Sequence, residues 1–215
     1  MRKTVCGLLT VLVFVSVFLT GCTSSKPFDV NDIATTARVF GIQELGAGTN
    51  ASTAIEYFKG QSNPPGYYIS KDKQEAQNLF DNYLNRFNWY PKASLDKMLV
   101  VASKEVYGTS LYTTDCCLLI FPGQSQAKSF YDSCVSGLES KHKNKTGYKS
   151  GYAYAITYSL SANRDGNCDW MKGVYLRGNS VLVISGYSPI DDKVQSFSDL
   201  IYKSLGLADP ATLNK

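Results

Sequence analysis

The sequence predicts an α+β fold, a two-layer sandwich in which a ferredoxin-like βαβ-βαβ repeat is extended by a C-terminal β-hairpin and helix. Two segments that each contain a strand, a helix and a following strand match at an offset of 51 residues. Two later strands are joined by Gly178-Asn179, a two-residue hairpin turn. A chain of 215 residues is long enough to bury these elements in one core.

The first predicted elements are a helix and a strand. Residues 29–40 predict the helix, because Asp29 or Asn31 can cap it, apolar residues recur on one face, and Gly41 follows as a stop signal. After a polar, glycine-containing linker at 46–52, apolar and polar residues alternate over 53–59 and predict a strand. A proline-rich turn then precedes the repeated segments.

The repeat consists of two helices, each introduced by a short apolar strand, at 67–70 and at 118–121. In both helices the apolar residues follow the spacing of a helix that lies on a core. They are Ala76, Leu79, Phe80, Tyr83, Leu84 and Phe87 in the first helix, and Ala127, Phe130, Tyr131, Cys134, Val135 and Leu138 in the second. Strand-like runs follow at 97–105 and 152–160. The alternative is a chance match of two amphipathic helices, but the matching strands favour a repeat.

The remaining elements complete one domain. Residues 170–177 and 180–185 predict the two strands of the hairpin, and Asp191 or Asp192 can cap a last helix that ends at Gly206. We therefore expect a single α+β domain at 29–210, followed by a tail at 211–215.

The composition excludes one class of partner. The chain has 22 basic and 18 acidic residues, and its net charge of +4 is too small for the electrostatic footprint of a nucleic-acid-binding protein. Charged residues make up only 19% of the chain, and 15 Tyr and 17 Gly favour sheets and turns over long solvated helices. We therefore expect no nucleic acid among the partners.

The N-terminus reads as an export signal. Arg2 and Lys3 precede an uncharged apolar run of about 16 residues, which is shorter than the roughly 20 residues that span a bilayer as a helix. The run ends in Leu19-Thr20-Gly21-Cys22, where an aliphatic residue and two small residues precede a cysteine. This motif resembles the lipobox of bacterial lipoproteins, and the resemblance covers residues 1–22.

The lipobox resemblance implies that the chain is cleaved before Cys22, that diacylglycerol is attached to the Cys22 thiol, and that a further acyl group such as palmitate often follows on the new amine. Residues 1–21 are then the signal peptide, and 22–28 are a lipidated tether. Two or three acyl chains hold a protein stably on a membrane, so the membrane is a partner through Cys22, on the extracytoplasmic side. An ordinary secretory signal and an uncleaved anchor are the alternatives.

Four cysteines remain once Cys6 leaves with the signal and Cys22 takes the lipid. Cys116, Cys117, Cys134 and Cys168 are candidates for disulfide bonds in an exported protein. Cys116 and Cys117 point to opposite faces of a strand, and a bond between these neighbours would be strained, which leaves two pairings open. Reduced thiols, with Cys134 filling a core position, are the alternative.

No motif predicts a catalytic residue, a metal site or a cofactor. The sequence has no C-x-x-C, no G-x-S-x-G and no Gly-rich phosphate loop, and its single histidine, His142, lies in a predicted lysine-rich loop. Residues 165–169 offer oxygens at alternate positions, as calcium loops do. However, Trp170 and Leu176 occupy the positions where such loops need Gly and Glu.

The candidate binding face is aromatic. Tyr152, Tyr154 and Tyr158 alternate along one strand and therefore share one face of the sheet. If no helix covers that face, these rings, with Trp170 or Tyr175, form an exposed platform for sugars, peptides or a protein partner. The alternative is that the first or last helix covers the rings and they belong to the core.

These observations predict a membrane-anchored extracytoplasmic lipoprotein whose domain binds or scaffolds an unidentified envelope ligand or protein partner, without catalysing a reaction. The alternative is a hydrolase of cell-envelope polymers. Such an enzyme would use a pair of carboxylates whose proximity only the fold can reveal.

Overall fold

The computed structural model describes residues 26–60, 63–107, 110–139, 142–163, 166–189 and 196–214. The predicted signal peptide and most of the predicted tether, Cys22 included, lie outside these residues. The strands are β1 Gln43–Glu44, β2 Gly66–Ile69, β3 Lys97–Tyr107, β4 Ser110–Ile120, β5 Lys143–Lys149, β6 Tyr152–Asn163, β7 Gly166–Arg177 and β8 Ser180–Pro189. The helices are α2 Val30–Val39, α3 Ala51–Lys59, α4 Lys73–Leu79, π-helix η1 Phe80–Leu84, α5 Gln124–Ser136, α6 Phe197–Ser204 and 3-10 helix η2 Pro210–Asn214.

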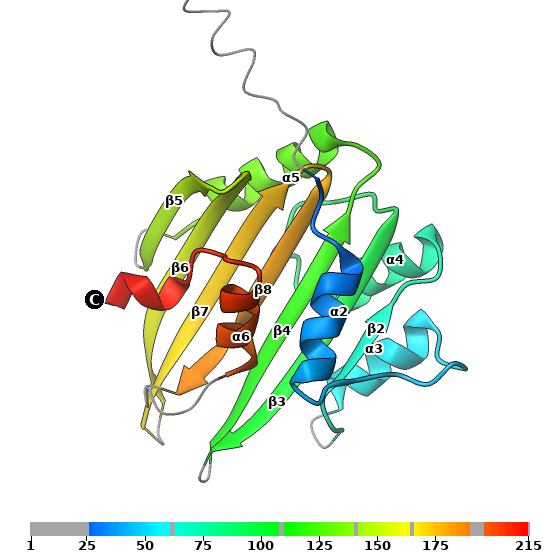
Figure 1. Ribbon diagram of the computed structural model, residues 1–215, viewed down its shortest axis with the longest axis horizontal. Coiled ribbons are helices and arrows are strands. Elements are labelled where there is room, and N and C mark those ends of the chain that lie inside the picture. Colours follow the sequence, from blue (N-terminus) through cyan, green and yellow to red (C-terminus); the bar gives the residue numbers. More distant parts are fainter. Residues whose placement is uncertain are drawn as a thin grey trace, which may run out of the picture.

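These elements form a mixed α+β fold on one eight-stranded sheet, with the strand order β1-β2-β3-β4-β8-β7-β6-β5 (Figure 1). Neighbouring strands are antiparallel, except that β1 and β2 are parallel. The α+β class predicted from the sequence is confirmed. The hairpin of β7 and β8 is also present, and Gly178 in its turn has a φ of +59°.

Helices cover both faces of the sheet, so the predicted two-layer arrangement is wrong. One face packs against α3, α4 and α5, and the other packs against α2 and α6 (Figure 1). The central strands explain why: residues 98–102 of β3 and 116–119 of β4 are continuously apolar and buried. Such runs place apolar side chains on both faces of a sheet, and each face then needs a cover.

The ferredoxin-like repeat is not confirmed. Each predicted unit does run strand, helix, strand, but β2 and β3, which flank the first helix, are antiparallel neighbours. In the second unit, β8 and β7 lie between β4 and β6. A ferredoxin-like βαβ unit needs parallel strands, whereas the β6–β7 and β7–β8 hairpins pair successive strands in antiparallel fashion.

The first predicted helix is confirmed as α2. The Asp29 carboxylate caps it by accepting from the Asn31 backbone N–H at 2.8 Å, and Gly41 follows with a φ of +81°. The folded region begins slightly earlier than predicted, because Phe28 is buried and its backbone N–H donates to Ser180 Oγ at 2.9 Å.

The segment predicted as a strand at 53–59 is wrong, because it forms helix α3. Asn50 Oδ1 accepts from the Thr53 backbone N–H at 3.0 Å, while the Asn50 N–H donates to Thr53 Oγ1 at 3.4 Å. This capping box fixes the first turn. The buried residues also follow a helical spacing: they are Ala51, Ala54, Ile55 and Phe58.

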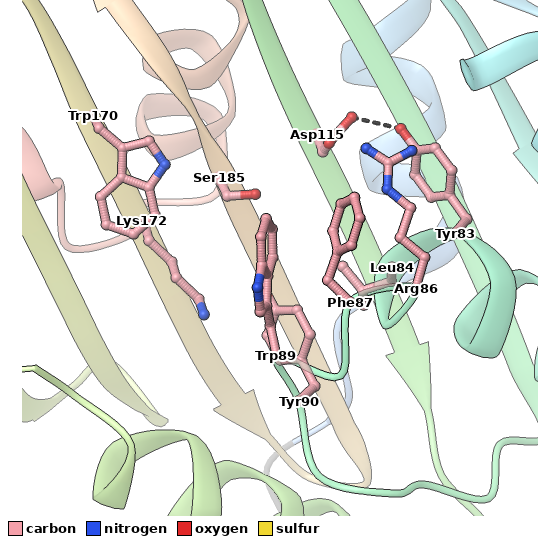
Figure 2. Close-up of a pocket in the computed structure, with 10 residues that line it drawn as sticks. All are labelled: Tyr83, Leu84, Arg86, Phe87, Trp89, Tyr90, Asp115, Trp170, Lys172 and Ser185. Carbon is pink, nitrogen blue, oxygen red and sulfur yellow. Dashed lines mark hydrogen bonds between the residues drawn. The ribbon is translucent and has the colours of Figure 1, made fainter. Parts of the chain in front are cut away.

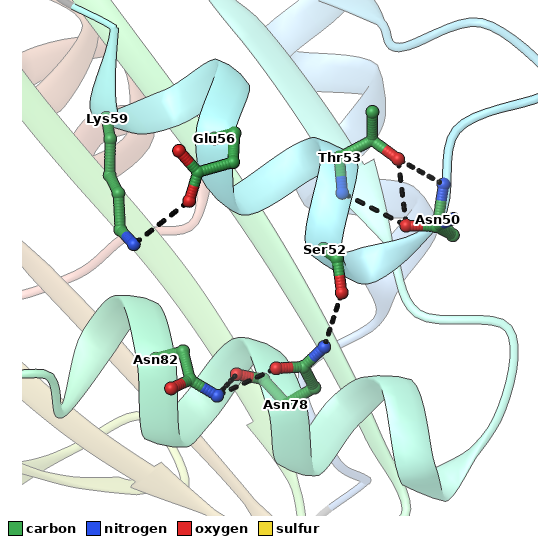
Figure 3. A network of polar contacts seen from close by, with 7 residues as sticks. All are labelled: Asn50, Ser52, Thr53, Glu56, Lys59, Asn78 and Asn82. Carbon is green, nitrogen blue, oxygen red and sulfur yellow. Dashed lines mark hydrogen bonds and ion pairs between the residues drawn. The ribbon is translucent and has the colours of Figure 1, made fainter.

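Polar side chains join α3 to α4 at the surface (Figure 3). Asn78 Nδ2 donates to Ser52 Oγ at 3.2 Å, and Asn82 Nδ2 donates to Asn78 Oδ1 at 2.7 Å. Beneath these contacts, both helices bury their apolar sides on the same face of the sheet.

The C-terminal segment differs from the prediction at both ends. Helix α6 is capped by Ser196, whose Oγ accepts from the Asp199 N–H at 3.2 Å. The predicted caps, Asp191 and Asp192, lie outside the described residues. The fold also extends into the predicted tail, since η2 reaches Asn214 and Leu213 packs against the core.

Candidate binding site

A hollow of about 90 Å³, partly open to solvent, lies between the segment that follows η1 and the strands β4, β8 and β7 (Figure 2). We call it the aromatic groove. It is lined by Tyr83, Leu84, Arg86, Phe87, Trp89, Tyr90, Asp115, Trp170, Lys172 and Ser185. Five of these ten side chains are aromatic, which makes the groove an apolar surface with a few polar groups, as ligand sites commonly are.

A π-helical turn and a short set of hydrogen bonds shape the segment above the groove. The Asn85 N–H donates to the Phe80 carbonyl at 2.7 Å and closes the π turn. The buried Asn85 side chain accepts from the Tyr90 N–H through its Oδ1 at 2.8 Å, and the Asn85 backbone carbonyl accepts from the Asn88 N–H at 2.8 Å. Asn88 has a φ of +56°, in the left-handed region that Asn tolerates better than most residues. π turns and left-handed residues are frequent at functional sites.

This turn exposes two aromatic rings. Phe87 is 56% exposed and Trp89 is 72% exposed, and their ring centroids lie 5.0 Å apart. The prediction that Phe87 belongs to a core stripe is therefore wrong, because the π turn breaks the helical spacing and the helix ends at Asn85. Trp89 does not belong to the apolar spacing of the predicted helix. The cluster of aromatic residues at 87–90 is the sequence feature that could have marked it as a binding residue.

A buried polar pair closes one side of the groove. Tyr83 donates its hydroxyl hydrogen to Asp115 Oδ1 at 2.6 Å. Burial raises the pKa of the Asp115 carboxyl, although the Tyr83 hydrogen bond and the charges of Arg86 and Lys104 act in the opposite direction. Burial lowers the pKa of Lys104, and the nearby Asp115 charge counters this effect.

Two cations also line the groove, on either side of Trp89 (Figure 2). Lys172 Nζ lies 4.3 Å from the centre of the Tyr90 ring, and the Arg86 guanidinium lies 4.8 Å from that of Phe87. Burial lowers the pKa of Lys172. Tyr90 is fixed in turn by stacking on Phe130, with ring centroids 6.2 Å apart and an interplanar angle of 14°.

The tyrosine face predicted from the sequence is largely core. Tyr152 is 3% exposed and Tyr158 is 2% exposed, so neither belongs to a platform, while Tyr154 is partly buried against the same cluster. The C-terminal segment packs in the same cluster as Tyr152 and Tyr154, and the Tyr152 hydroxyl donates to the Gly206 carbonyl at 3.0 Å. Trp170 projects from the opposite face of the sheet, where it lines the aromatic groove.

Three of the four candidate disulfide cysteines carry free thiols in the structure. Cys116 and Cys117 are buried on opposite faces of β4, as predicted, and Cys134 is partly buried on α5. Cys168 lies in β7, but its side chain is outside the described part of the structure. Burial raises the pKa of the Cys134 thiol to about 11.

His142 lies in the bend that precedes β5, as predicted, although the lysines that follow it belong to that strand rather than to the loop. Its Nε2 lies 3.7 Å from a Glu139 carboxylate oxygen, and its ring centroid is 5.8 Å from that of Trp170. Gly166–Asp169, in the segment whose oxygens alternate as in calcium loops, is extended backbone in β7. Within the described ranges, His, Cys, Asp and Glu side chains form no group of three that would hold a metal ion.

Comparisons with known proteins are sparse. No protein-family model matches the chain, and no curated protein matches it. Among solved structures, the chain is similar to the extracellular domain of PknH from Mycobacterium tuberculosis, with a TM-score of 0.38 and 9% sequence identity, over 88% of this chain and 98% of that chain. This likeness is too distant to assign a fold family or a function. Over the residues that the structure describes, no helix has the length and apolar character needed to cross a bilayer.

Proposed function

We propose that the protein is a lipid-anchored, extracytoplasmic binding protein of the cell envelope, and that its ligand binds in the aromatic groove. The anchor is inferred from the lipobox-like sequence Leu19-Thr20-Gly21-Cys22 after a short apolar run. Acyl chains on Cys22 would hold the domain at the membrane. The groove would then be presented to the polymers outside it.

The observation that carries the binding proposal is the exposed pair Phe87 and Trp89. Large apolar rings of this kind usually bury 150–250 Å² each, but here the hydrogen bonds of Asn85 hold their backbone in a turn that exposes both. Clustered exposed apolar side chains beside a hollow mark ligand or partner sites. A ligand that covers both rings would gain their burial without having to order the turn.

The groove favours binding over the hydrolase alternative. Hydrolysis of a glycosidic bond commonly uses two carboxylates that face each other across the substrate. Asp115 is the one carboxylate among the residues that line the groove, and it already accepts a hydrogen bond from Tyr83. We therefore propose a role in binding, without chemistry on the ligand.

The anchor is tested by substitution of Cys22. Cys22→Ala should abolish incorporation of labelled palmitate and release the protein from the membrane fraction. Cys6→Ala is the matched control, because Cys6 lies in the predicted signal peptide and should leave both properties unchanged. Membrane retention and labelling of the Cys22→Ala protein would contradict the proposal.

The groove is tested by binding of purified cell-wall polysaccharide to the full-length protein in detergent. Trp89→Ala and Phe87→Ala should each weaken co-sedimentation about tenfold, since each removes apolar area that the ligand would cover. Tyr148→Ala is the matched control, because Tyr148 is 70% exposed on β5 and does not line the groove. Equal binding by all four proteins, or an equal loss in the control, would contradict the proposal.

A further inference from the structure

We infer that Lys172 is the anion receptor of the aromatic groove and that the ligand is a saccharide whose sugar rings carry carboxylates. This inference rests on the proposed binding function and names the ligand class for the same site. Three observations support it: the Lys172 amine lies inside the groove, the Asp115 carboxylate is already hydrogen-bonded to Tyr83, and flat aromatic rings line the groove beside the amine.

The Lys172 amine is held inside the groove. The side chain leaves β7 on the same face of the sheet as Trp170, is partly buried, and places Nζ 4.3 Å from the centre of the Tyr90 ring. Burial and the fixed Tyr90 ring restrict the amine, so little conformational freedom is left to lose on binding.

Among the described side chains, no carboxylate forms an ion pair with Lys172. The described lysines that have such partners are Lys59, Lys73 and Lys128, all elsewhere on the surface. Asp115, the carboxylate of the groove, is bonded to Tyr83. A partly desolvated ammonium with an aromatic ring as its partner gains more from a charge-assisted hydrogen bond than a fully solvated one does.

The rings beside Lys172 select for a flat, partly apolar ligand. Trp89 and Phe87 are exposed, and Trp170 lies on the far side of the groove (Figure 2). A sugar ring has an apolar face that can lie on an aromatic ring and a polar edge that remains hydrated. A carboxylate on that edge would reach Lys172, and Arg86 adds a second positive charge at the other end of the groove.

A single-stranded nucleic acid also combines flat rings with negative charge. The composition disfavours it, because the excess of basic residues is small and includes Arg2 and Lys3 of the predicted signal peptide. A carboxylated saccharide is also the ligand that suits the proposed location at the cell envelope.

The experiment is a titration of tryptophan fluorescence with the full-length protein in detergent. The probes are an oligogalacturonate, a maltooligosaccharide of the same length, and an oligothymidylate. The oligogalacturonate should bind at least about tenfold tighter than the maltooligosaccharide. Lys172→Met should weaken oligogalacturonate binding about 10- to 100-fold and leave maltooligosaccharide binding unchanged, as expected for the loss of one charge-assisted bond.

Two further variants complete the design. Lys172→Arg should keep most of the affinity, because it keeps the charge, and Lys145→Met should change nothing, because Lys145 is exposed on β5 away from the groove. Undiminished oligogalacturonate binding by Lys172→Met, tighter binding of oligothymidylate, or no saccharide binding would overturn the inference. The proposed function is judged separately, by the effect of Trp89→Ala on polysaccharide binding.

Discussion

Asp115 carries a carboxylate into the apolar side of the sheet, and burial raises its pKa above the ordinary value of 3.8. The native state therefore holds the proton more tightly than the unfolded state does. It follows that stability falls as the pH rises from about 3.8 through the raised pKa, and that this loss persists at higher pH. Asp115 thus lowers the stability of the native state at neutral pH.

We predict that Asp115→Asn is more stable than the wild type at neutral pH and that its advantage disappears at and below pH 3.8. The amide keeps an acceptor for the Tyr83 hydroxyl but carries no charge to desolvate. Urea unfolding at a series of pH values measures the difference. Asp132→Asn, at an exposed ion pair, should show no such rise with pH, and an advantage of Asp115→Asn that shrinks as pH rises would contradict the argument.

Cys134 provides a second prediction at the level of single residues. Because burial raises its pKa to about 11, we expect alkylation by iodoacetamide at pH 7.5 to be far slower than for an exposed cysteine, whose pKa is near 8.5. The rate should increase as the pH is raised toward 11. Mass spectrometry of the native protein follows the reaction, and Cys134→Ser identifies the modified site. Rapid labelling of Cys134 at neutral pH would show that the thiol is accessible and ionised.

The sequence predicts side-chain direction better than it predicts partners. The opposite orientations of Cys116 and Cys117 follow from the alternation of a strand. The partner of Asp115 does not follow from any local pattern, since Tyr83 lies 32 residues earlier in the chain. The groove is formed by contacts between residues that are distant in the chain, so the sequence does not identify its residues as a set.

Among the elements, the turn after η1 determines the site. Asn85→Ala removes the acceptor of the Tyr90 N–H, which is then left without that bond in a buried position. We predict a loss of about 1–3 kcal/mol in the free energy of unfolding, together with weaker ligand binding as the turn loosens. Urea unfolding and Trp89 fluorescence anisotropy measure the two effects.

The control for Asn85 is Asn82→Ala. Asn82 is exposed and its amide bonds to Asn78 at the surface, so its removal should change stability by less than about 0.5 kcal/mol. Equal losses in both variants would mean that the buried bond has no special part in holding the turn.

Helix α3 and the π turn show where local patterns fail. Over 53–59 the apolar residues fit both an alternating and a helical spacing, and a segment this short does not separate the two. The capping box of Asn50 and Thr53 distinguishes them in the structure. The stripe that ends at Phe87 fails for another reason: a π turn adds a residue to the helical repeat, and no residue type specifies that insertion.

At the scale of the whole molecule, the sequence indicates which elements exist but not how the strands are ordered. The β7–β8 hairpin was predictable, because its turn residues specify an antiparallel pair. The position of β8 beside β4 was not predictable, because this pairing joins residues some seventy positions apart in the chain. Cys116, for example, pairs with Ile184. The second helical layer was not predictable for the same reason, because it brings together α2 and α6, which lie near opposite ends of the chain.

The C-terminal segment covers part of one face of the sheet, and its removal should expose Tyr152 and Tyr175 on that face. Truncation after Leu205 removes the buried Leu207 and the carbonyls that accept from Tyr152 and Tyr175, at 3.0 and 2.6 Å. Burial of one Leu contributes about 2 kcal/mol, and each lost hydrogen bond about 1 kcal/mol. We therefore predict a loss of about 4 kcal/mol in the free energy of unfolding.

The truncated protein should also show greater acrylamide quenching of its tyrosines and stronger binding of an apolar dye, because the rings become solvent-exposed. Leu207→Ala separates packing from hydrogen bonding, and we expect it to lose about 2–3 kcal/mol without the change in tyrosine quenching. If the truncated protein unfolds at the same urea concentration as the wild type, the segment does not stabilise this face. In that case the burial of Tyr152 and Tyr175 must depend on α2 and α6 alone.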